Sequence, residues 1–338
     1  MENIQKDYIY YPVRVKTLNR YEHFKRLVES LQRNTDADKT EFVIGLDYPP
    51  NEKYREGYEK IRDYIPTITG FKKVTVFYTD VNLGPLKNGE RLIEYVKEQG
   101  YDASIGTEDD NEFSPNFIQY MNWGLNHYRD DKSVYAICGF SKLNTEGVEG
   151  SVYKLNNIFA GWGVGQWFNR KEKLIPYQDL WYLKEILDKM PITIIFSKKI
   201  FRANSIIGML YGGWPYGDTI PMFLPDNERW CVFPTVSKVR NWGQDGSGIH
   251  GKSEEGQKRN STMPIDTSLV FEGDNREDIY SPLMDTRFKE AYKRSLKEYF
   301  KSVVVYLVYK LTGKIPVGNH TSKWRKIKLD DLKLPKER

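Results

Sequence analysis

The first 140 residues alternate short apolar segments with longer amphipathic ones, and this alternation restricts the chain to few folds. Five segments are predicted to be strands, namely 11–15, 41–47, 73–79, 103–107 and 133–139. The segments between them carry apolar residues at helical spacing, as Phe24, Leu27 and Leu31 do within residues 22–33. Strands and helices that alternate through short loops form a doubly wound, mostly parallel α/β sheet. Ligands of such a sheet bind beyond the carboxyl ends of its strands.

Later parts of the chain give weaker signals. Residues 142–254 contain glycine- and tryptophan-rich loops, with a helix predicted over Tyr177–Lys189 and a strand or short buried segment over Ile192–Phe196. Two helix starts are predicted from capping patterns in the first half. Asn19 is followed three residues later by Glu22, and Ser114 is followed by Pro115.

Charge is distributed unevenly along the chain, whose net charge is +5. Residues 286–338 contain 15 Lys/Arg and 5 Asp/Glu, so this segment carries +10 and the preceding residues carry −5. An acidic body lacks the basic footprint of a nucleic-acid-binding protein, which excludes nucleic acid as the main partner. The apolar stretch from Phe300 to Leu311 is flanked by lysines. It predicts either a helix on an anionic membrane surface or a helix packed on the body.

Cysteine content and the absence of long apolar runs predict a cytoplasmic protein. Cys138 and Cys231 are far apart and fit neither a metal site nor a redox motif. So few thiols in 338 residues are typical of a reducing compartment. Residues 1–11 lack the apolar core of a signal peptide, and no apolar run reaches the ~20 residues of a membrane-spanning helix.

The acidic run Glu108-Asp109-Asp110 follows the fourth predicted strand. Adjacent carboxylates repel one another unless a cation or solvent compensates their charge. Hard oxygen ligands of this kind suit Mg²⁺ or Mn²⁺, which proteins hold with one or two carboxylates and substrate phosphates. The alternative is an acidic approach to the next helix, whose dipole favours negative charge. The position after a buried strand favours the metal.

Two further segments contain candidate chemistry. Gly243, Gly246, Gly248 and Gly251 surround His250, a residue type that can bind a metal beside a carboxylate. The alternative is a surface histidine in a flexible loop. Asp218 lies in an aromatic-rich stretch and could serve as a general base or as a helix N-cap. The first loop, Leu18-Asn19-Arg20, lacks the glycines of dinucleotide-binding loops and P-loops, so both of these sites are excluded.

In this order, the motifs resemble those of the GT-A-fold nucleotide-sugar transferases. The similarity is greatest to bacterial sugar transferases of polysaccharide biosynthesis and more distant to eukaryotic N-acetylglucosaminyltransferases. It covers residues 11–251. The motifs that carry it are Arg14–Arg20, Asn82-Leu83-Gly84 with Asn88, Glu108-Asp109-Asp110, Gly161-Trp162-Gly163 with Trp167 and Arg170, and 234–251 with Asp245-Gly246-Ser247-Gly248 and His250.

The resemblance implies an inverting glycosyltransferase that needs Mn²⁺ or Mg²⁺. Asp110 and His250 are the implied metal ligands, and Asp218 is the implied catalytic base. The residues implied to bind the nucleotide sugar are Thr17, Leu18, Arg20, Asp47, Asn82, Gly84, Asn88, Glu108, Asp109, Gly161, Trp162 and Trp167. The implied donor is a nucleotide sugar, with UDP favoured. The implied acceptor is a carbohydrate or a lipid-linked oligosaccharide in capsule or O-antigen assembly.

The resemblance also divides the chain into three parts. Residues 1–140 form a nucleotide-sugar-binding half, 141–255 form the acceptor and catalytic half of the same domain, and 256–338 form a basic helical extension. Two departures affect the second half. Val164-Gly165-Gln166 differs from the family's sequence at the acceptor border, and Gly217 replaces the expected acidic residue before Asp218.

Two other functions are compatible with this topology. A sugar-phosphate nucleotidyltransferase can share the fold and the metal, but its first loop is glycine-rich, unlike Leu18-Asn19-Arg20. A non-catalytic nucleotide- or carbohydrate-binding module would retain metal and nucleotide binding without turnover.

Overall fold

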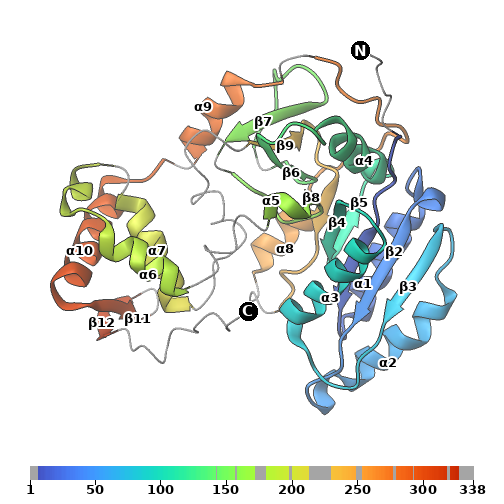
Figure 1. The fold of residues 1–338 in the computed structure, drawn as a ribbon, viewed down its shortest axis with the longest axis horizontal. Helices are drawn as coiled ribbons and strands as arrows, with labels where there is room; N and C mark the ends of the chain where they lie inside the picture. Colours follow the sequence, from blue (N-terminus) through green and yellow to red (C-terminus); the bar gives the residue numbers. More distant parts are fainter. Residues whose placement is uncertain are drawn as a thin grey trace.

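A computed structural model describes residues 7–141, 143–156, 158–171, 180–197, 200–212, 230–248, 253–276, 279–291, 293–317 and 320–326 (Figure 1). Its strands are β1 Val13–Thr17, β2 Glu41–Leu46, β3 Lys73–Phe77, β4 Ala103–Glu108, β5 Asn111–Phe113, β6 Val134–Cys138, β7 Val152–Asn156, β8 Val164–Trp167, β9 Trp230–Pro234, β10 Val239–Asn241, β11 Lys314–Val317 and β12 His320–Lys326. Its α-helices are α1 Tyr21–Gln32, α2 Arg55–Tyr64, α3 Gly84–Glu98, α4 Phe117–His127, α5 Phe168–Lys171, α6 Leu180–Lys189, α7 Ile200–Gly212, α8 Glu254–Ser261, α9 Pro282–Ala291 and α10 Leu296–Thr312.

Eight of the strands form one mixed sheet in the order β3-β2-β1-β4-β8-β6-β9-β7. The first four are parallel to one another, and β6 and β9 are also parallel. The pairs β4–β8, β6–β8 and β7–β9 are antiparallel. The predicted α/β class with a mostly parallel sheet is confirmed.

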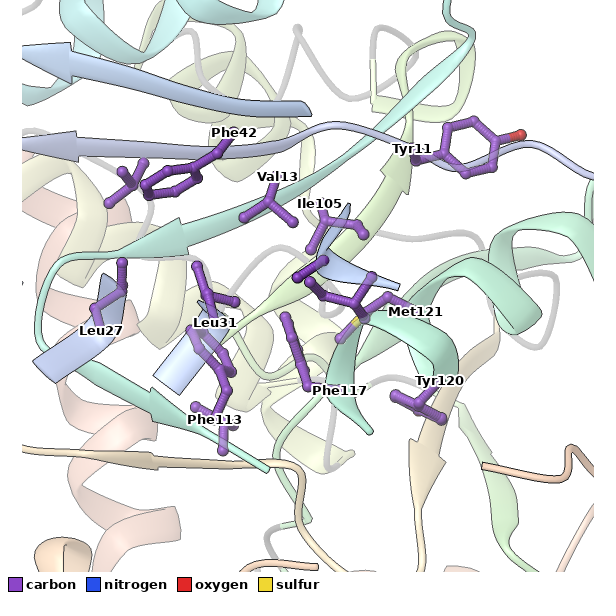
Figure 2. Close-up of a cluster of buried hydrophobic side chains, with 14 of the residues drawn as sticks. Tyr11, Val13, Leu27, Leu31, Phe42, Ile105, Phe113, Phe117, Tyr120 and Met121 are labelled. Carbon is purple, nitrogen blue, oxygen red and sulfur yellow. The ribbon is translucent and has the colours of Figure 1, made fainter. Parts of the chain in front are cut away.

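Helices cover both faces of the sheet, as a doubly wound fold requires. Phe42 and Ile44 of β2 face the core that contains Leu27 and Leu31 of α1, whereas Val43 faces the cluster that contains Leu92 of α3. Successive side chains of a strand point to opposite faces, so one strand supplies both cores. Figure 2 shows the larger core, where Val13 and Ile105 lie among side chains of α1 and α4.

A second, two-stranded antiparallel sheet joins β5 to β10. Asn241 pairs with Asn111 across it. Because β5 starts directly after Asp110, this pairing brings residues 239–243 to the end of β4. Strands of three residues are too short to show a periodic pattern, which explains why the sequence did not reveal them.

A separate helical cluster lies at the left of Figure 1. It combines α6 and α7 with α10 and the β11–β12 hairpin, and its core includes Leu183, Ile206 and Tyr306. The cluster therefore combines segments from both sides of the boundary predicted between residues 255 and 256. In contrast, α9 packs on the sheet body, where Met284 is buried with Tyr153 and Phe233.

Three local predictions were wrong. Helix α1 starts after Arg20, with no side-chain cap, so Asn19 does not cap it. Helix α4 starts at Phe117 after Asn116, while the Ser114 hydroxyl donates to the Asn116 side chain instead. Residues Ile192–Phe196 form a 3₁₀-helix, and Phe196 is 82% exposed. This segment has apolar composition, but its backbone is not extended.

Within the described part of the chain, no helix combines the length and apolar character needed to cross a bilayer.

Arg170 ties the end of α4 to the sheet. Its side chain is buried, and its guanidinium lies 3.4 Å from the centre of the Trp167 ring. It donates hydrogen bonds to the carbonyls of Tyr128 at 2.8 Å and Arg129 at 2.9 Å, and to that of Val134. Arg170 and Trp167 therefore form a buried structural link, away from solvent.

We expect Arg170→Met to lower the free energy of unfolding by about 2–5 kcal/mol, because it leaves buried carbonyls without donors. Arg129→Met is the matched control, since Arg129 forms a partly exposed pair with Asp102 at 2.9 Å. Its effect should stay within about 1 kcal/mol. Urea unfolding measures both values, and equal losses in the two variants would contradict the structural role of Arg170.

Candidate active site

The candidate site lies where the carboxyl ends of β1, β2 and β4 meet. These three strands are parallel neighbours, with β1 between the other two. Thr17, Asp47 and Asp109 therefore lie at the same edge of the sheet, and the Asp47 amide donates to the Thr17 carbonyl at 3.0 Å. From β1 the chain continues to β2 on one side and reaches β4 on the other. Such a switch point is where open α/β sheets bind ligands.

Two buried carboxylates share one guanidinium at this edge. Arg20 donates to Asp110 Oδ2 at 2.8 Å and also to Asp109 Oδ1. The Thr17 hydroxyl donates to Asp109 Oδ2 at 2.9 Å. Burial raises the pKa of Asp109 above its usual range, because it outweighs the charge of Arg20. The same two carboxylates raise the pKa of Arg20 despite its own burial. Asp109, Asp110 and Arg20 thus form a compact charged cluster.

The β5–β10 pair holds Asp110 from the other side. Asn241 Nδ2 donates to Asp110 Oδ1 at 2.7 Å, and the Trp242 backbone amide donates to the Asp110 carbonyl at 2.8 Å. The Gly243 amide in turn donates to Asn241 Oδ1 at 2.9 Å. A Cβ atom at Gly243 would lie 2.1 Å from Asp110 Oδ2, so any larger residue at this position would displace the carboxylate.

The side chains of this cluster determine whether it can bind a metal ion. Within the residues that the structure describes, no three His, Cys, Asp or Glu side chains are close enough to hold a metal ion. Mn²⁺ and Mg²⁺ need only one or two carboxylates when substrate phosphates complete their coordination. Each Asp110 oxygen accepts one hydrogen bond, and a carboxylate oxygen has about two acceptor positions. Asp109 and Asp110 therefore fit a metal that arrives with a diphosphate. Glu108 is exposed beside them.

Asp47 organises the loop before α3. Its carboxylate accepts from the backbone amides of Leu83 and Gly84, each at 2.8 Å, and from its neighbour Tyr48 at 2.9 Å. The Asn82 side chain donates to the Tyr48 carbonyl at 2.6 Å. Gly84 has a φ of +74°, which favours glycine at this turn. A carboxylate at the N-terminus of α3 also compensates the helix dipole. Asp47 and Asn82 thus fix the loop beside the charged cluster.

Asn88 and Arg91 fasten α3 to the strand ends. Asn88 is buried and donates to the Gly45 carbonyl at 2.9 Å. Arg91 donates to Asn88 Oδ1 at 2.9 Å and to the carbonyls of Phe77 at 3.0 Å and Tyr78 at 3.1 Å. Asn88 therefore supports the loop before α3 by holding this helix against the end of β2. Sequence reasoning missed Arg91, because nothing distinguishes it from other polar residues of an amphipathic helix.

Hydrogen bonds among His23, Asp245 and Ser247 join the glycine loop after β10 to α1, and we call these three residues the latch. His23 Nε2 lies 2.8 Å from Asp245 Oδ2 and 3.3 Å from the Ser247 hydroxyl. Ser247 donates to Asp245 Oδ1 through its amide at 2.9 Å and through its hydroxyl at 2.6 Å. Burial opposes ionisation of Asp245, but the hydrogen bonds from Ser247 and His23 outweigh it and lower the pKa of Asp245 to about 2. Sequence reasoning missed His23, which lies in an ordinary helical pattern.

The remaining predicted residues fall into three groups. Leu18 is half-buried and follows Thr17 in the loop after β1. Gly161 is exposed and Trp162 is partly buried, with its ring 4.5 Å from that of Phe140, whereas Trp167 is only 2% exposed within the main core. Asp218 and His250 lie outside the described residues.

No protein-family model matches the chain, and no curated protein sequence matches it. Solved structures match parts of it. A mannosyltransferase from Pyrobaculum calidifontis, in complex with GDP-Man and Mn²⁺, is 13% identical with a TM-score of 0.34, and the match covers 50% of this chain and 47% of that one. The WbbM bifunctional glycosyltransferase is 11% identical with a TM-score of 0.30, covering 54% and 36%. Mouse xyloside xylosyltransferase 1 is 9% identical with a TM-score of 0.27, covering 48% and 69%.

All three of these proteins are named as sugar transferases, the class that the motifs resemble. The chain spans about half the length of the mannosyltransferase. At these scores the likeness does not assign the chain to a family, and the fold class rests on the strand order of the chain itself.

We expect the latch to make stability depend on acid pH. The folded pKa of Asp245, about 2, lies below its unfolded value of about 3.9. Its ionised form therefore stabilises the fold above about pH 4, and this contribution is lost as pH falls towards 2. Asp245 is 37% exposed, which limits the effect to less than about 1 kcal/mol. Urea unfolding from pH 6 to pH 3 should show a shallower pH dependence for Asp245→Asn. An unchanged dependence would contradict the latch.

Proposed function

We propose that the protein is an inverting glycosyltransferase that moves a sugar from a nucleoside-diphosphate sugar, with UDP favoured, to an acceptor hydroxyl. One observation carries the proposal: two buried carboxylates, Asp109 and Asp110, lie at a switch point and share the single guanidinium of Arg20. This donor set suits a divalent cation and a diphosphate together. The transfer of a sugar and the inverting stereochemistry are proposed from the motif resemblance.

The donor side of the proposal rests on the charged cluster and the side chains around it. Asp110 would hold Mn²⁺ or Mg²⁺, together with His250, whose role rests on sequence position alone. When bound, the metal would stabilise the negative charge that develops on the leaving diphosphate. Thr17 and Asn241 orient the two carboxylates through their hydrogen bonds. We assign Asp47 to holding the loop at Asn82 in place, because each of its two oxygens already accepts from two donors, which are three backbone amides and the Asn82 side chain.

Arg20 acts as the counter-ion of the two carboxylates while no cation is bound. Its fork donates to both groups, which suits a guanidinium better than an ammonium. When a divalent cation neutralises the carboxylates, the same guanidinium is available to a phosphate of the donor, which it can bind in the same bidentate manner. In this proposal Arg20 exchanges one anionic partner for another, because it offsets part of the carboxylate charge before the cation binds and phosphate charge afterwards.

The acceptor side of the proposal rests on sequence. Asp218 remains the proposed base, which would take the proton of the acceptor hydroxyl as its oxygen attacks the anomeric carbon. Gly161 and Trp162 are the proposed contacts for sugar, since both reach the surface of the described structure. The proposed acceptor is a carbohydrate or a lipid-linked oligosaccharide in bacterial surface polysaccharide assembly.

A donor panel tests the function. With Mn²⁺ and a mixture of carbohydrate acceptors, the protein should release nucleoside diphosphate from one nucleotide sugar, and Asp110→Ala should reduce release by about 10²-fold or more. Glu98→Gln is the control, because Glu98 is an exposed carboxylate at the last residue of α3, and it should retain the wild-type rate of release. Release of pyrophosphate from a nucleoside triphosphate and a sugar phosphate would indicate a nucleotidyltransferase instead. Metal-dependent nucleotide binding without turnover would indicate a binding module.

The counter-ion role of Arg20 predicts opposite effects on two ligands. In Arg20→Met, Mn²⁺ should bind more tightly than in the wild-type protein when no nucleotide is present, because a competing cation has been removed. In the presence of Mn²⁺, UDP should bind at least about tenfold more weakly than it binds the wild-type protein, because the guanidinium that binds its phosphate is lost. Electron paramagnetic resonance measures free Mn²⁺, and calorimetry measures UDP. Arg33→Met is the control, because Arg33 is exposed directly after α1, and it should bind both ligands like the wild-type protein. Weaker binding of both ligands in Arg20→Met would contradict the exchange.

A further inference from the structure

Helix α10 exposes a continuous apolar stripe. Leu296, Phe300 and Val304 recur every four residues, and Leu311 returns to the same face two turns later. Their exposed fractions are 77%, 63%, 54% and 79%. At 1.5 Å per residue the stripe is about 22 Å long. Single exposed apolar residues are common, but a row of this length on one helix face marks an interaction site.

The stripe does not result from poor packing of the helix, because the opposite face is fully used. Val305, Tyr306 and Tyr309 are buried against α6, α7 and β11. The Tyr306 hydroxyl donates to the Met190 carbonyl at 2.7 Å, and the Tyr309 hydroxyl donates to Asp188. The helix thus has one apolar face inside its cluster and a second one outside it.

Both ends of α10 are capped, which fixes the orientation of the stripe. Ser295 and Glu298 form a capping box, with the Glu298 amide 3.2 Å from the Ser295 hydroxyl and the Ser295 amide 2.7 Å from the Glu298 carboxylate. Gly313 closes the other end with a φ of +66°. The exposed face therefore belongs to a complete helix rather than to a fraying one.

The charge beside the stripe is positive. Lys297 and Lys301 are exposed on the flank of the same face, and Lys293 is exposed just before the helix. The one acidic residue of α10, Glu298, is engaged in the capping box. The segment from residue 286 to the end of the chain carries a net +10. An apolar stripe beside exposed lysines is the pattern of a helix that lies in the interface of an anionic bilayer.

We propose that α10 docks on an anionic phospholipid surface, with Leu296, Phe300, Val304 and Leu311 inserted between the head groups and Lys297 and Lys301 beside the lipid phosphates. This proposal does not depend on the proposed glycosyl transfer, because none of these residues belongs to the candidate active site.

Vesicle flotation of the full chain tests the proposal. The wild-type protein should float with phosphatidylcholine vesicles that contain phosphatidylglycerol and should bind at least about tenfold less to pure phosphatidylcholine vesicles. Phe300→Glu/Val304→Glu should lower binding to the anionic vesicles by about tenfold or more. Lys297→Gln/Lys301→Gln should lower the same binding and reduce its sensitivity to salt.

A double variant on the sheet body is the matched control. Leu269→Glu/Val270→Glu places the same charges on two residues that are 67% and 57% exposed, and it should float like the wild-type protein. Circular dichroism and thermal unfolding check that each variant is folded. Failure of the wild-type chain to float with anionic vesicles would overturn the proposal, as would equal flotation of Phe300→Glu/Val304→Glu. A dimer in light scattering that becomes a monomer in that variant, without flotation of the wild type, would show that a second copy covers the stripe.

Nucleoside diphosphate release from the nucleotide sugar, measured with a soluble acceptor, separates this proposal from the proposed function. The stripe variants should retain that activity, whereas Asp110→Ala should lose it and still float. A wild-type protein that releases nucleoside diphosphate but does not float would contradict only the membrane proposal, and one that floats but releases none would contradict only the proposed function.

Discussion

The arrangement of the site depends on how two adjacent buried carboxylates are compensated. Asp109 and Asp110 follow β4 directly, and ionised carboxylates without partners are too costly to bury. Arg20 supplies charge from the loop after β1, and Asn241 supplies a donor from β10. Arg20 reaches the carboxylates because β1 ends beside β4 in the main sheet, and Asn241 reaches them because β10 pairs with β5 directly after Asp110. The charged cluster thus fixes the β1 loop, the β4 end and the β5–β10 pair relative to one another.

The parts of the fold that the sequence predicted are those with a burial pattern. All five predicted strands exist, because buried strands and amphipathic helices produce local periodicity. β5, β8 and β10 have three or four residues and include a glycine or polar residues, so their positions follow from pairing with distant segments. The same reason applies to the site. Glu108-Asp109-Asp110 is a local motif that the sequence shows directly. The His23–Asp245 latch joins residues far apart in sequence, so the sequence does not show that the two side chains are in contact.

Aromatic residues show why residue type alone does not give a role. Trp162 and Trp167 stand five positions apart in one motif, and both were predicted to shape a sugar site. Trp162 reaches the surface, whereas Trp167 is buried beneath Arg170, which pairs with the carbonyls at the end of α4. The motif therefore combines a surface residue with a structural one. An aromatic side chain contributes large buried area in either role, so only its neighbours distinguish the two.

The candidate active site and the apolar stripe of α10 lie on different parts of the molecule. The charged cluster at Asp110 belongs to the sheet body, whereas α10 is stabilised by the helical cluster that buries Tyr306. Removing the exposed side chain of Phe300 takes no contact from the sheet core, because that side chain belongs to neither hydrophobic core. Packing therefore does not require an apolar residue at this position, and neither does it at Leu296 or Leu311. These apolar residues repeat along one capped helix although packing does not require them, which indicates that they contact a partner outside the fold. An anionic bilayer surface is such a partner, because it takes up apolar side chains beside positive charge.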